Sequence, residues 1–182
     1  MKYFHCRFLE IGSGSGYVVC SIARALNACT GGCLCLATDI HDSACQATTE
    51  TLRNHGVDTT VDVVRCDLVG PLMARMENVV EVVAFNPPYV VTPDSEIEAG
   101  GISAAWAGGL RGRRVIDRVL PLLERIIAVG GIVYMIAIHD NDPEEIIQVM
   151  RGYSFVGEIL AKQSADEELL YVLKFVKTEK NE

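Results

Sequence analysis

A short rigid motif follows the apolar run VVAF and consists of Asn86, Pro87, Pro88 and Tyr89. Proline fixes φ and has no amide hydrogen, so two successive prolines end a strand and stiffen the backbone after it. The side-chain oxygen of Asn86 and the carbonyl of Pro87 could then accept the two N–H bonds of a planar amide or amine nitrogen. Such acceptors aim the nitrogen lone pair at an electrophilic methyl group, while Tyr89 stacks on the planar group. The motif predicts methyl transfer to nitrogen without a strong general base.

A glycine-rich segment, EIGSGSG, provides the second group of candidate residues. Gly12, Gly14 and Gly16 permit positive φ and let backbone N–H groups approach a ligand at the start of a helix. Their spacing differs from the G-x-G-x-x-G dinucleotide fingerprint, which favours S-adenosylmethionine over a nicotinamide cofactor. Glu10, just before the glycines, is placed to meet the ammonium group of the methionine moiety. We assign Ser13, inside the loop, to the same cofactor site.

Two further acidic residues end predicted strands. Asp39, in LATDI, can accept hydrogen bonds from both ribose hydroxyls, and Ile40 follows it. Asp67, in VVRCDL, is placed to accept the adenine amine, with the backbone of Leu68 as donor; an ordinary helix cap is the alternative for Asp67. Carboxyl ends of parallel strands meet at one edge of an open sheet, where ligands bind. We therefore expect these residues and Asn86 around one cofactor.

Apolar runs alternate with amphipathic segments along most of the chain, which is typical of a parallel sheet covered by helices. We expect strands near residues 4–11, 33–39, 60–66, 79–85 and 131–138, and helices near 17–29, 43–55, 113–129 and 142–151. Two strand-like runs at 155–161 and 169–176, joined by the polar residues 162–168, predict an antiparallel hairpin. The expected fold is α/β and Rossmann-like: a doubly wound, mostly parallel seven-stranded sheet of the class I methyltransferase type.

The composition limits the class of protein. A chain of 182 residues is predicted to form one domain, 1–182, and its net charge of -8 argues against strong binding to nucleic acid. Its seven cysteines lack paired spacing, so we expect reduced thiols and no metal site. No apolar stretch approaches the roughly 20 residues of a membrane span, so we expect no membrane association. Without an N-terminal leader sequence, the cytoplasm is the expected location, with the nucleus as a further one.

The longest segment without a predicted helix or strand spans residues 86–112 and contains an acidic run and Trp106. Long segments of this kind are usually functional or disordered. We interpret Trp106 as a packed anchor of the loop, with closure over a substrate as the alternative. Arg111, Arg113 and Arg114 come at a predicted helix start, where cations oppose the helix dipole. We expect Asp117, one turn later, to be their ionic partner, with a docking surface as the alternative.

Four stretches together, EIGSGSG, TDI, FNPPYVV and AWAGGLRGRRVIDR, resemble the HemK family, specifically its shorter eukaryotic and archaeal branch. The resemblance covers almost the whole chain and implies a protein-glutamine N5-methyltransferase. Such an enzyme uses S-adenosylmethionine to modify the glutamine of a Gly-Gly-Gln motif in a class I translation termination factor. The resemblance also implies a heterodimer with a small zinc-binding activator subunit, and histone lysine methylation has been ascribed to this branch.

The resemblance assigns roles to the same positions that the residue types indicate. By position it implies cofactor residues at Glu10, Gly12, Gly14 and Asp39, adenine contacts at Asp67 and Leu68, and the acceptor site at residues 86–89. The chain is 49% hydrophobic, and an activator bound along an edge such as residues 60–64 would cover excess apolar surface. A well-filled sheet is the alternative explanation. In the family, an N-terminal segment that lies over the cofactor precedes the first strand. Met1 of this chain comes almost directly before the predicted first strand, so we expect the chain to lack that segment.

Three other functions remain open at this point. An Asn-Pro-Pro-Tyr motif serves an adenine amino-methyltransferase equally well, although base flipping needs a recognition module or a basic channel. A protein-lysine methyltransferase would use the same cofactor. A catalytically silent scaffold that binds a partner is the third alternative.

Overall fold

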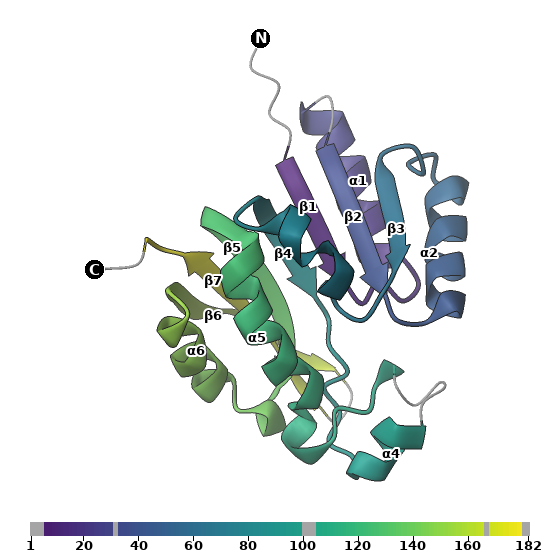
Figure 1. Ribbon diagram of the computed structural model, residues 1–182. Coiled ribbons are helices and arrows are strands. Elements are labelled where there is room, and N and C mark those ends of the chain that lie inside the picture. The colour runs from purple at the N-terminus through teal and green to yellow at the C-terminus, as the bar shows by residue number, and fades with distance from the viewer. Residues whose placement is uncertain (1–5, 31–32, 100–104, 166–167, 180–182) are drawn as a thin grey trace.

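The computed structural model of the chain describes residues 6–30, 33–99, 105–165 and 168–179. Seven strands form one sheet in the order β3-β2-β1-β4-β5-β7-β6 (Figure 1). The strands are β1 (Cys6–Ile11), β2 (Cys33–Asp39), β3 (Val61–Arg65), β4 (Val80–Phe85), β5 (Ile127–Ile138), β6 (Phe155–Ala165) and β7 (Glu168–Lys177). Strands β1 to β5 pair in parallel, and β7 runs antiparallel to both β5 and β6. The predicted fold class and C-terminal hairpin are confirmed.

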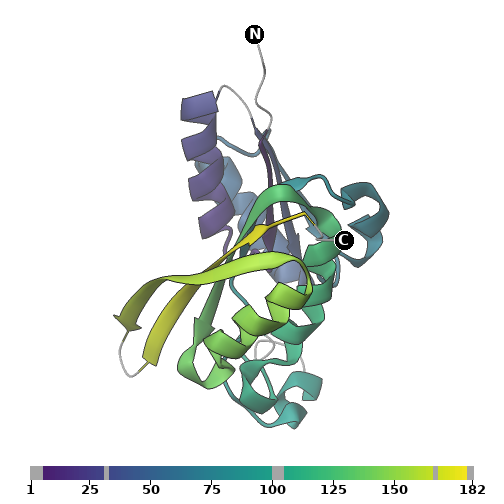
Figure 2. The ribbon, with the colours of Figure 1, turned by 90° about the vertical axis from the view of Figure 1, so that its left-hand side faces the viewer.

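Helices cover both faces of the sheet. They are α1 (Tyr17–Thr30), α2 (Asp42–Asn54), α3 (Met73–Met76), α4 (Asp94–Ala99), α5 (Arg114–Ile126) and α6 (Pro143–Gly152), with 3-10 turns η1 (Gly70–Leu72), η3 (Leu110–Gly112) and η4 (His139–Asn141). Helices α1 and α2 lie on one face, α5 and α6 lie on the other, and α4 lies beyond the carboxyl ends of the strands (Figures 1 and 2). None of the described helices is long and apolar enough to cross a membrane.

Two apolar cores, one on each face, hold the helices to the sheet. Helix α5 buries a stripe at helical spacing, formed by Ile116, Val119, Leu120, Leu123 and Ile126, against the central strands. On the other face, residues of α1 and α2 pack on β1 and β2 in a smaller cluster. Strand β2 is buried on both faces near its carboxyl end, as expected for a central parallel strand. The carboxyl ends of β1 to β4 are therefore held in fixed positions.

The predicted helix 113–129 is too long at its C-terminal end. Helix α5 stops at Ile126, and β5 begins at Ile127, four residues before the predicted strand. The amine of Lys177 donates hydrogen bonds to the carbonyls of Glu124 and Ile127 and to Asn78 Oδ1. Because Lys177 comes from the last strand, this termination of α5 depends on a contact that local sequence does not reveal.

Two predicted irregular segments contain regular structure. The acidic run within residues 86–112 forms α4, and the polar residues 162–165 continue β6. In the hairpin, Lys162 pairs with Tyr171, and its amine lies 5.1 Å from the centre of the tyrosine ring. Such cross-strand pairs stabilise a strand of polar composition. The first two residues of the predicted first strand, 4 and 5, lie outside the described part of the chain.

Candidate active site

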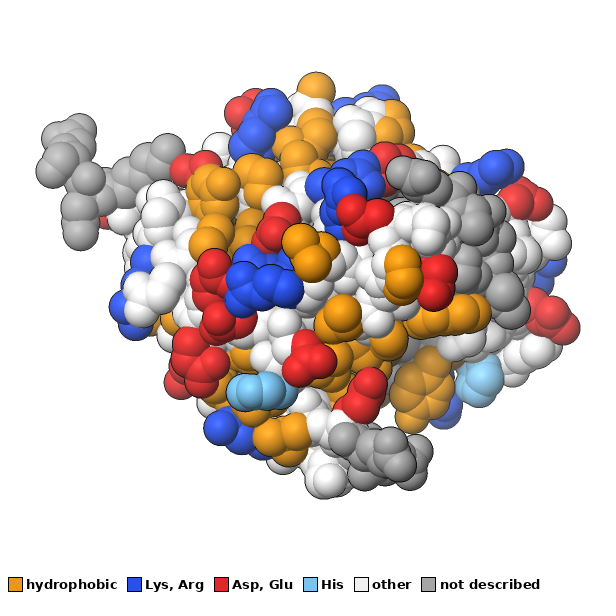
Figure 3. Space-filling view, turned by 90° about the horizontal axis from the view of Figure 1, so that it is seen from below, with side chains coloured by type: hydrophobic (Ala, Val, Ile, Leu, Met, Phe, Trp, Pro, Cys, Tyr) orange, Lys and Arg blue, Asp and Glu red, His pale blue; other side chains and the backbone are white. Residues whose placement is uncertain are grey.

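A cavity of about 440 Å³ opens where the carboxyl ends of β1 to β4 meet the segment before α5. Ligand pockets usually have volumes of roughly 300–1,000 Å³. The predicted site residues in its wall are Gly12, Gly14, Asp39, Ile40, Asp67, Leu68, Asn86 and Pro88. Figure 3 looks onto this edge of the sheet, where hydrophobic side chains lie among dispersed Asp and Glu side chains. The fold thus brings the glycine loop, two of the predicted carboxylates and the amide of Asn86 to one cavity.

The carboxylate of Asp39 is fixed by backbone donors. Its Oδ2 accepts a hydrogen bond from the amide of Gly14 at 3.0 Å, and its Oδ1 accepts one from the amide of His41 at 2.9 Å. A carboxylate can accept about four hydrogen bonds, so capacity for two more remains. The side chain is 9% exposed and lines the cavity, an arrangement suited to a diol such as a ribose.

Two predicted cofactor residues, Ser13 and Gly16, support the loop instead of lining the cavity. Ser13 Oγ accepts a hydrogen bond from the hydroxyl of Thr48 at 2.9 Å. Gly16 has φ +77, and a Cβ there would lie 2.8 Å from the Cα of Thr48. The backbone of α2 therefore packs directly on the glycine loop, which explains why the third glycine is needed. Direct contact of Ser13 and Gly16 with a cofactor stays a prediction.

Glu10 is buried beneath the glycine loop. It is 3% exposed, and its Oε2 accepts a hydrogen bond from the backbone amide of Val19 in α1 at 2.9 Å. The pKa of Glu10 is raised from its ordinary value of 4.5 to about 8, and burial is the largest cause. The hydrogen bond from Val19 lowers this pKa, and the charge of Asp39 raises it. Because Glu10 is not among the residues in the cavity wall, the predicted contact with an ammonium group remains a prediction.

The raised pKa of Glu10 predicts a pH dependence of stability. Between the unfolded value of 4.5 and the folded value of about 8, the folded chain holds a proton that the unfolded chain has released. The free energy of unfolding should therefore fall as pH rises through this range. Glu10→Gln, which cannot ionise, should remove that part of the dependence in urea titrations at several pH values. An unchanged pH profile would contradict the buried, protonated state.

Two buried polar atoms beside the cavity have no hydrogen-bond partner among the described residues. They are Thr38 Oγ1 and His41 Nε2, and both residues lie in the cavity wall. A buried polar group without a partner costs free energy, so a bound ligand with donors or acceptors can stabilise these atoms. The apolar side chains of Leu68 and Phe85 line the same cavity. This combination fits a nucleoside, which has a flat apolar ring and polar edges.

Asp67 has a partner that the sequence did not predict. Its Oδ2 accepts a hydrogen bond from a guanidinium nitrogen of Arg118 at 2.6 Å, and both side chains are about half exposed. Arg118 also lines the cavity. No local signal marks it, because its position depends on how α5 packs on the sheet. The other carboxylate oxygen of Asp67 remains compatible with an amine, so the adenine contact stays a prediction.

Residues 86–89, here named the acceptor motif, lie beside the glycine loop. Asn86 is exposed and lines the cavity with Pro88, whereas Pro87 is buried and Tyr89 is half-buried. A Cβ added to Gly12 would lie 4.0 Å from the carbonyl oxygen of Asn86. Burial, followed by the charge of Glu168, raises the pKa of the Tyr89 hydroxyl, so this side chain stays neutral. The structure does not place Pro87 and Tyr89 in the cavity wall, and their acceptor roles stay predictions.

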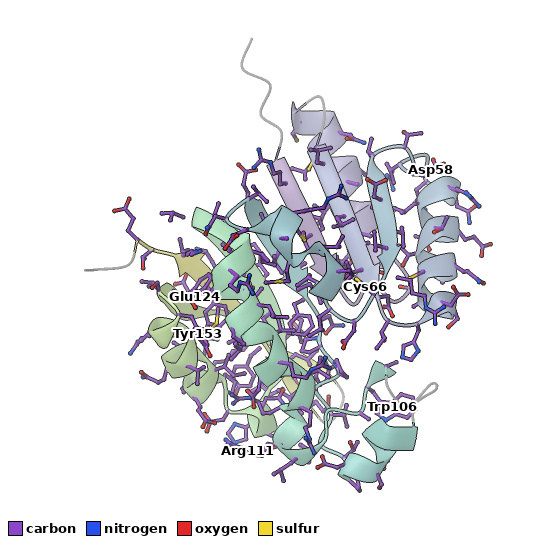
Figure 4. All side chains as sticks on the ribbon, in the orientation of Figure 1. Asp58, Cys66, Trp106, Arg111, Glu124 and Tyr153 are labelled. Carbon is purple, nitrogen blue, oxygen red and sulfur yellow. The ribbon has the colours of Figure 1, made fainter. Side chains whose placement is uncertain are left out.

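The segment after α4 packs on the acceptor motif. Val90 forms a parallel bridge with Ala107, and Trp106, 42% exposed, lies on the loop below the strand ends (Figure 4). The expected ion pair of Arg113 with Asp117 is confirmed, with 2.7 Å between the guanidinium and the carboxylate. Its two neighbouring arginines instead reach other acidic residues: Arg111 pairs with Asp142 and Glu145, and Arg114 pairs with Asp94. The arginine cluster thus ties this segment to α4, α5 and α6.

Among the described residues, no group of three or more potential metal ligands lies together.

No protein-family model matches the sequence. A human protein named methyltransferase HEMK2 is 41% identical over 170 residues, which cover 93% of this chain and 77% of that protein. The catalytic subunit mtq2 of the eRF1 methyltransferase of Schizosaccharomyces pombe is 33% identical over 147 residues, 75% of this chain and 62% of that protein.

A solved structure has the same fold. The Mtq2-Trm112 complex of E. cuniculi, described as responsible for the methylation of the eRF1 translation termination factor, superposes with a TM-score of 0.65 at 24% identity. The superposition covers 96% of this chain and 87% of that one. Identity of 41% over nearly the entire chain, together with the cavity at the strand ends, shows that this chain belongs to the HemK family of methyltransferases.

Proposed function

We propose that this methyltransferase transfers the methyl group of S-adenosylmethionine to the side-chain amide of the glutamine in a Gly-Gly-Gln motif of a translation termination factor. The observation that carries the proposal is the position of Asn86. Its amide lies on a proline-stiffened turn in the wall of the cavity that also contains Asp39 and the glycine loop. The names of the relatives support the termination factor as the substrate class.

The residues in the wall suit this cofactor. Asp39 would accept the ribose hydroxyls, and the apolar side chains of Ile40 and Leu68 would contact the adenine. When bound, S-adenosylmethionine supplies an electrophilic methyl group on a positively charged sulfur. Asn86 would accept an N–H of the glutamine amide, orient its nitrogen, and stabilise the positive charge that grows on it.

A small zinc-binding activator subunit belongs to the proposal. Strand β3 forms one edge of the sheet, so its outer backbone groups are available to pair with another strand. Next to it, the β2 residue Leu34 is 64% exposed and lies in a second cavity with Thr60 and Asp62. The solved complex of Mtq2 with Trm112 supports a two-subunit enzyme.

The proposal predicts a methylated glutamine in a defined substrate. The chain, co-expressed with the activator, is incubated with S-adenosylmethionine and a termination factor, and the product is mapped by fragmentation mass spectrometry. The matched control is the factor with its motif glutamine replaced by asparagine. An adenine oligonucleotide and a lysine-rich histone peptide are offered in parallel. Methylation of either of these, with the factor unmodified, would overturn the proposal.

A further inference from the structure

Asn141, the last residue of η4, joins three segments around the acceptor motif. It is 0% exposed, and both polar atoms of its side-chain amide form hydrogen bonds. Nδ2 donates hydrogen bonds to the carbonyl of Tyr89 at 2.8 Å and to the carbonyl of Arg111 at 2.9 Å. Oδ1 accepts a hydrogen bond from the amide of Ile138 at 2.8 Å. One side chain therefore connects the acceptor motif, the segment before α5 and the end of β5.

The acceptor motif is held at both ends by the backbone. Before it, Phe85 pairs with Ile11 and Met135 in the sheet. After it, the amide of Val90 donates to the carbonyl of Trp106 at 3.0 Å, and the carbonyl of Val90 accepts from Gly108 at 2.8 Å. Asn141, which lies in η4 after β5, donates a hydrogen bond to the carbonyl of Tyr89, the last residue of the motif.

The junction is so closely packed that two of its positions, Gly108 and Gly112, have no room for a Cβ. A Cβ added to Gly112, which has φ +65, would lie 1.9 Å from the carbonyl oxygen of Tyr89 and 2.4 Å from Nδ2 of Asn141. A Cβ added to Gly108 would lie 2.6 Å from the carbonyl oxygen of Pro88. The amide of Asn141 is thus the donor that satisfies two backbone carbonyls in a closely packed place.

Buried Arg113 holds Asn141 in turn. Its guanidinium donates to the backbone carbonyl of Asn141 at 2.8 Å and to Asp117 and Glu145. Figure 4 shows its neighbour Arg111 at the bottom of the molecule, where it pairs with Asp142 at the start of α6. Asn141 and the segment before α5 are therefore connected to α5 and α6 by charge-assisted hydrogen bonds.

We propose that Asn141 is a positioning residue for methyl transfer: its side-chain amide sets the place of the acceptor motif relative to the glycine loop. The inference rests on the proposed function only in that residues 86–89 receive the acceptor nitrogen. Asn141 is not among the residues that line the cavity, so it acts through the motif and leaves the cofactor contacts unchanged. A displacement of about 1 Å at the reacting atoms can cost a rate factor of about 100.

The sharpest variant is Asn141→Asp, which has the same shape and keeps the acceptor for Ile138 but loses the donor to Tyr89 and Arg111. We expect kcat to fall about 10- to 100-fold, while the dissociation constant of the cofactor changes less than about threefold. The matched control is Asn78→Ala. It removes a hydrogen bond to Lys177 and places alanine at φ +54, so it should lower stability without lowering kcat.

Hydrogen exchange tests the same inference without turnover. The amides of Val90 and Gly108 should exchange faster in Asn141→Asp than in Asn78→Ala at equal global stability. Exchange and kcat that match the control would overturn the inference, and so would faster exchange with unchanged kcat. The rate is measured with whichever acceptor the wild-type enzyme methylates. If glutamine is not that acceptor, the proposed function fails, whereas the exchange rates still decide whether Asn141 holds the motif.

Discussion

Asn86→Ala is expected to abolish methyl transfer while the cofactor still binds. The variant removes the side-chain oxygen that, in the proposed function, orients the acceptor nitrogen and stabilises its growing positive charge. Loss of one oriented polar group at a reacting centre typically costs about 100- to 1,000-fold in kcat. Asn86 lies in the wall of the cavity and is exposed, so its removal should change the free energy of unfolding very little.

The experiment separates binding from chemistry. Single-turnover rates with saturating cofactor give the transfer step, and calorimetry gives the dissociation constant of the cofactor. Asn54→Ala, at the exposed C-terminal end of α2, is the matched control and should match the wild-type chain in both measurements. A tenfold or greater loss of cofactor affinity in Asn86→Ala, with an unchanged transfer rate at saturating cofactor, would show that Asn86 binds cofactor and has no separate role in transfer.

Asp39→Ala is expected to have the opposite signature. Loss of a charged hydrogen-bond acceptor for the ribose should weaken cofactor binding by about 1–3 kcal/mol, which corresponds to about 5- to 150-fold in the dissociation constant. Transfer at saturating cofactor should fall much less, because the proposed contact of Asp39 is with the ribose and that of Asn86 is with the acceptor nitrogen. The amides of Gly14 and His41 also lose their acceptor, so the variant should be less stable than the wild-type chain.

Stability and binding must be measured separately in this case. Urea unfolding without cofactor reports the loss of the two backbone contacts, and calorimetry on the folded variant reports the loss of affinity. Asp58→Ala is the matched control, since Asp58 is exposed at the opposite end of the sheet (Figure 4). An Asp39→Ala variant that binds cofactor as tightly as the Asp58→Ala control would remove Asp39 from the ribose site.

Local patterns were sufficient for the fold and for eight of the eighteen residues in the cavity wall. Apolar runs of four to eight residues placed the strands, because a parallel strand covered by helices on both faces is nearly continuously apolar. Asp39, Asp67 and Asn86 were predicted together, since the ends of parallel strands share one edge. The length of α5 was predicted wrongly, because the amine that ends it belongs to Lys177 in the last strand.

The sequence by itself determined which residue types follow each strand, and so which chemistry the edge of the sheet can perform. Only the tertiary structure decided which side chains support that chemistry: Glu10 lies beneath the loop, Arg118 reaches Asp67, and Asn141 holds the carbonyl of Tyr89. The physical reason is distance along the chain. Strand ends depend on local periodicity, whereas a partly buried hydrogen bond between residues 52 positions apart depends on how helices and strands pack.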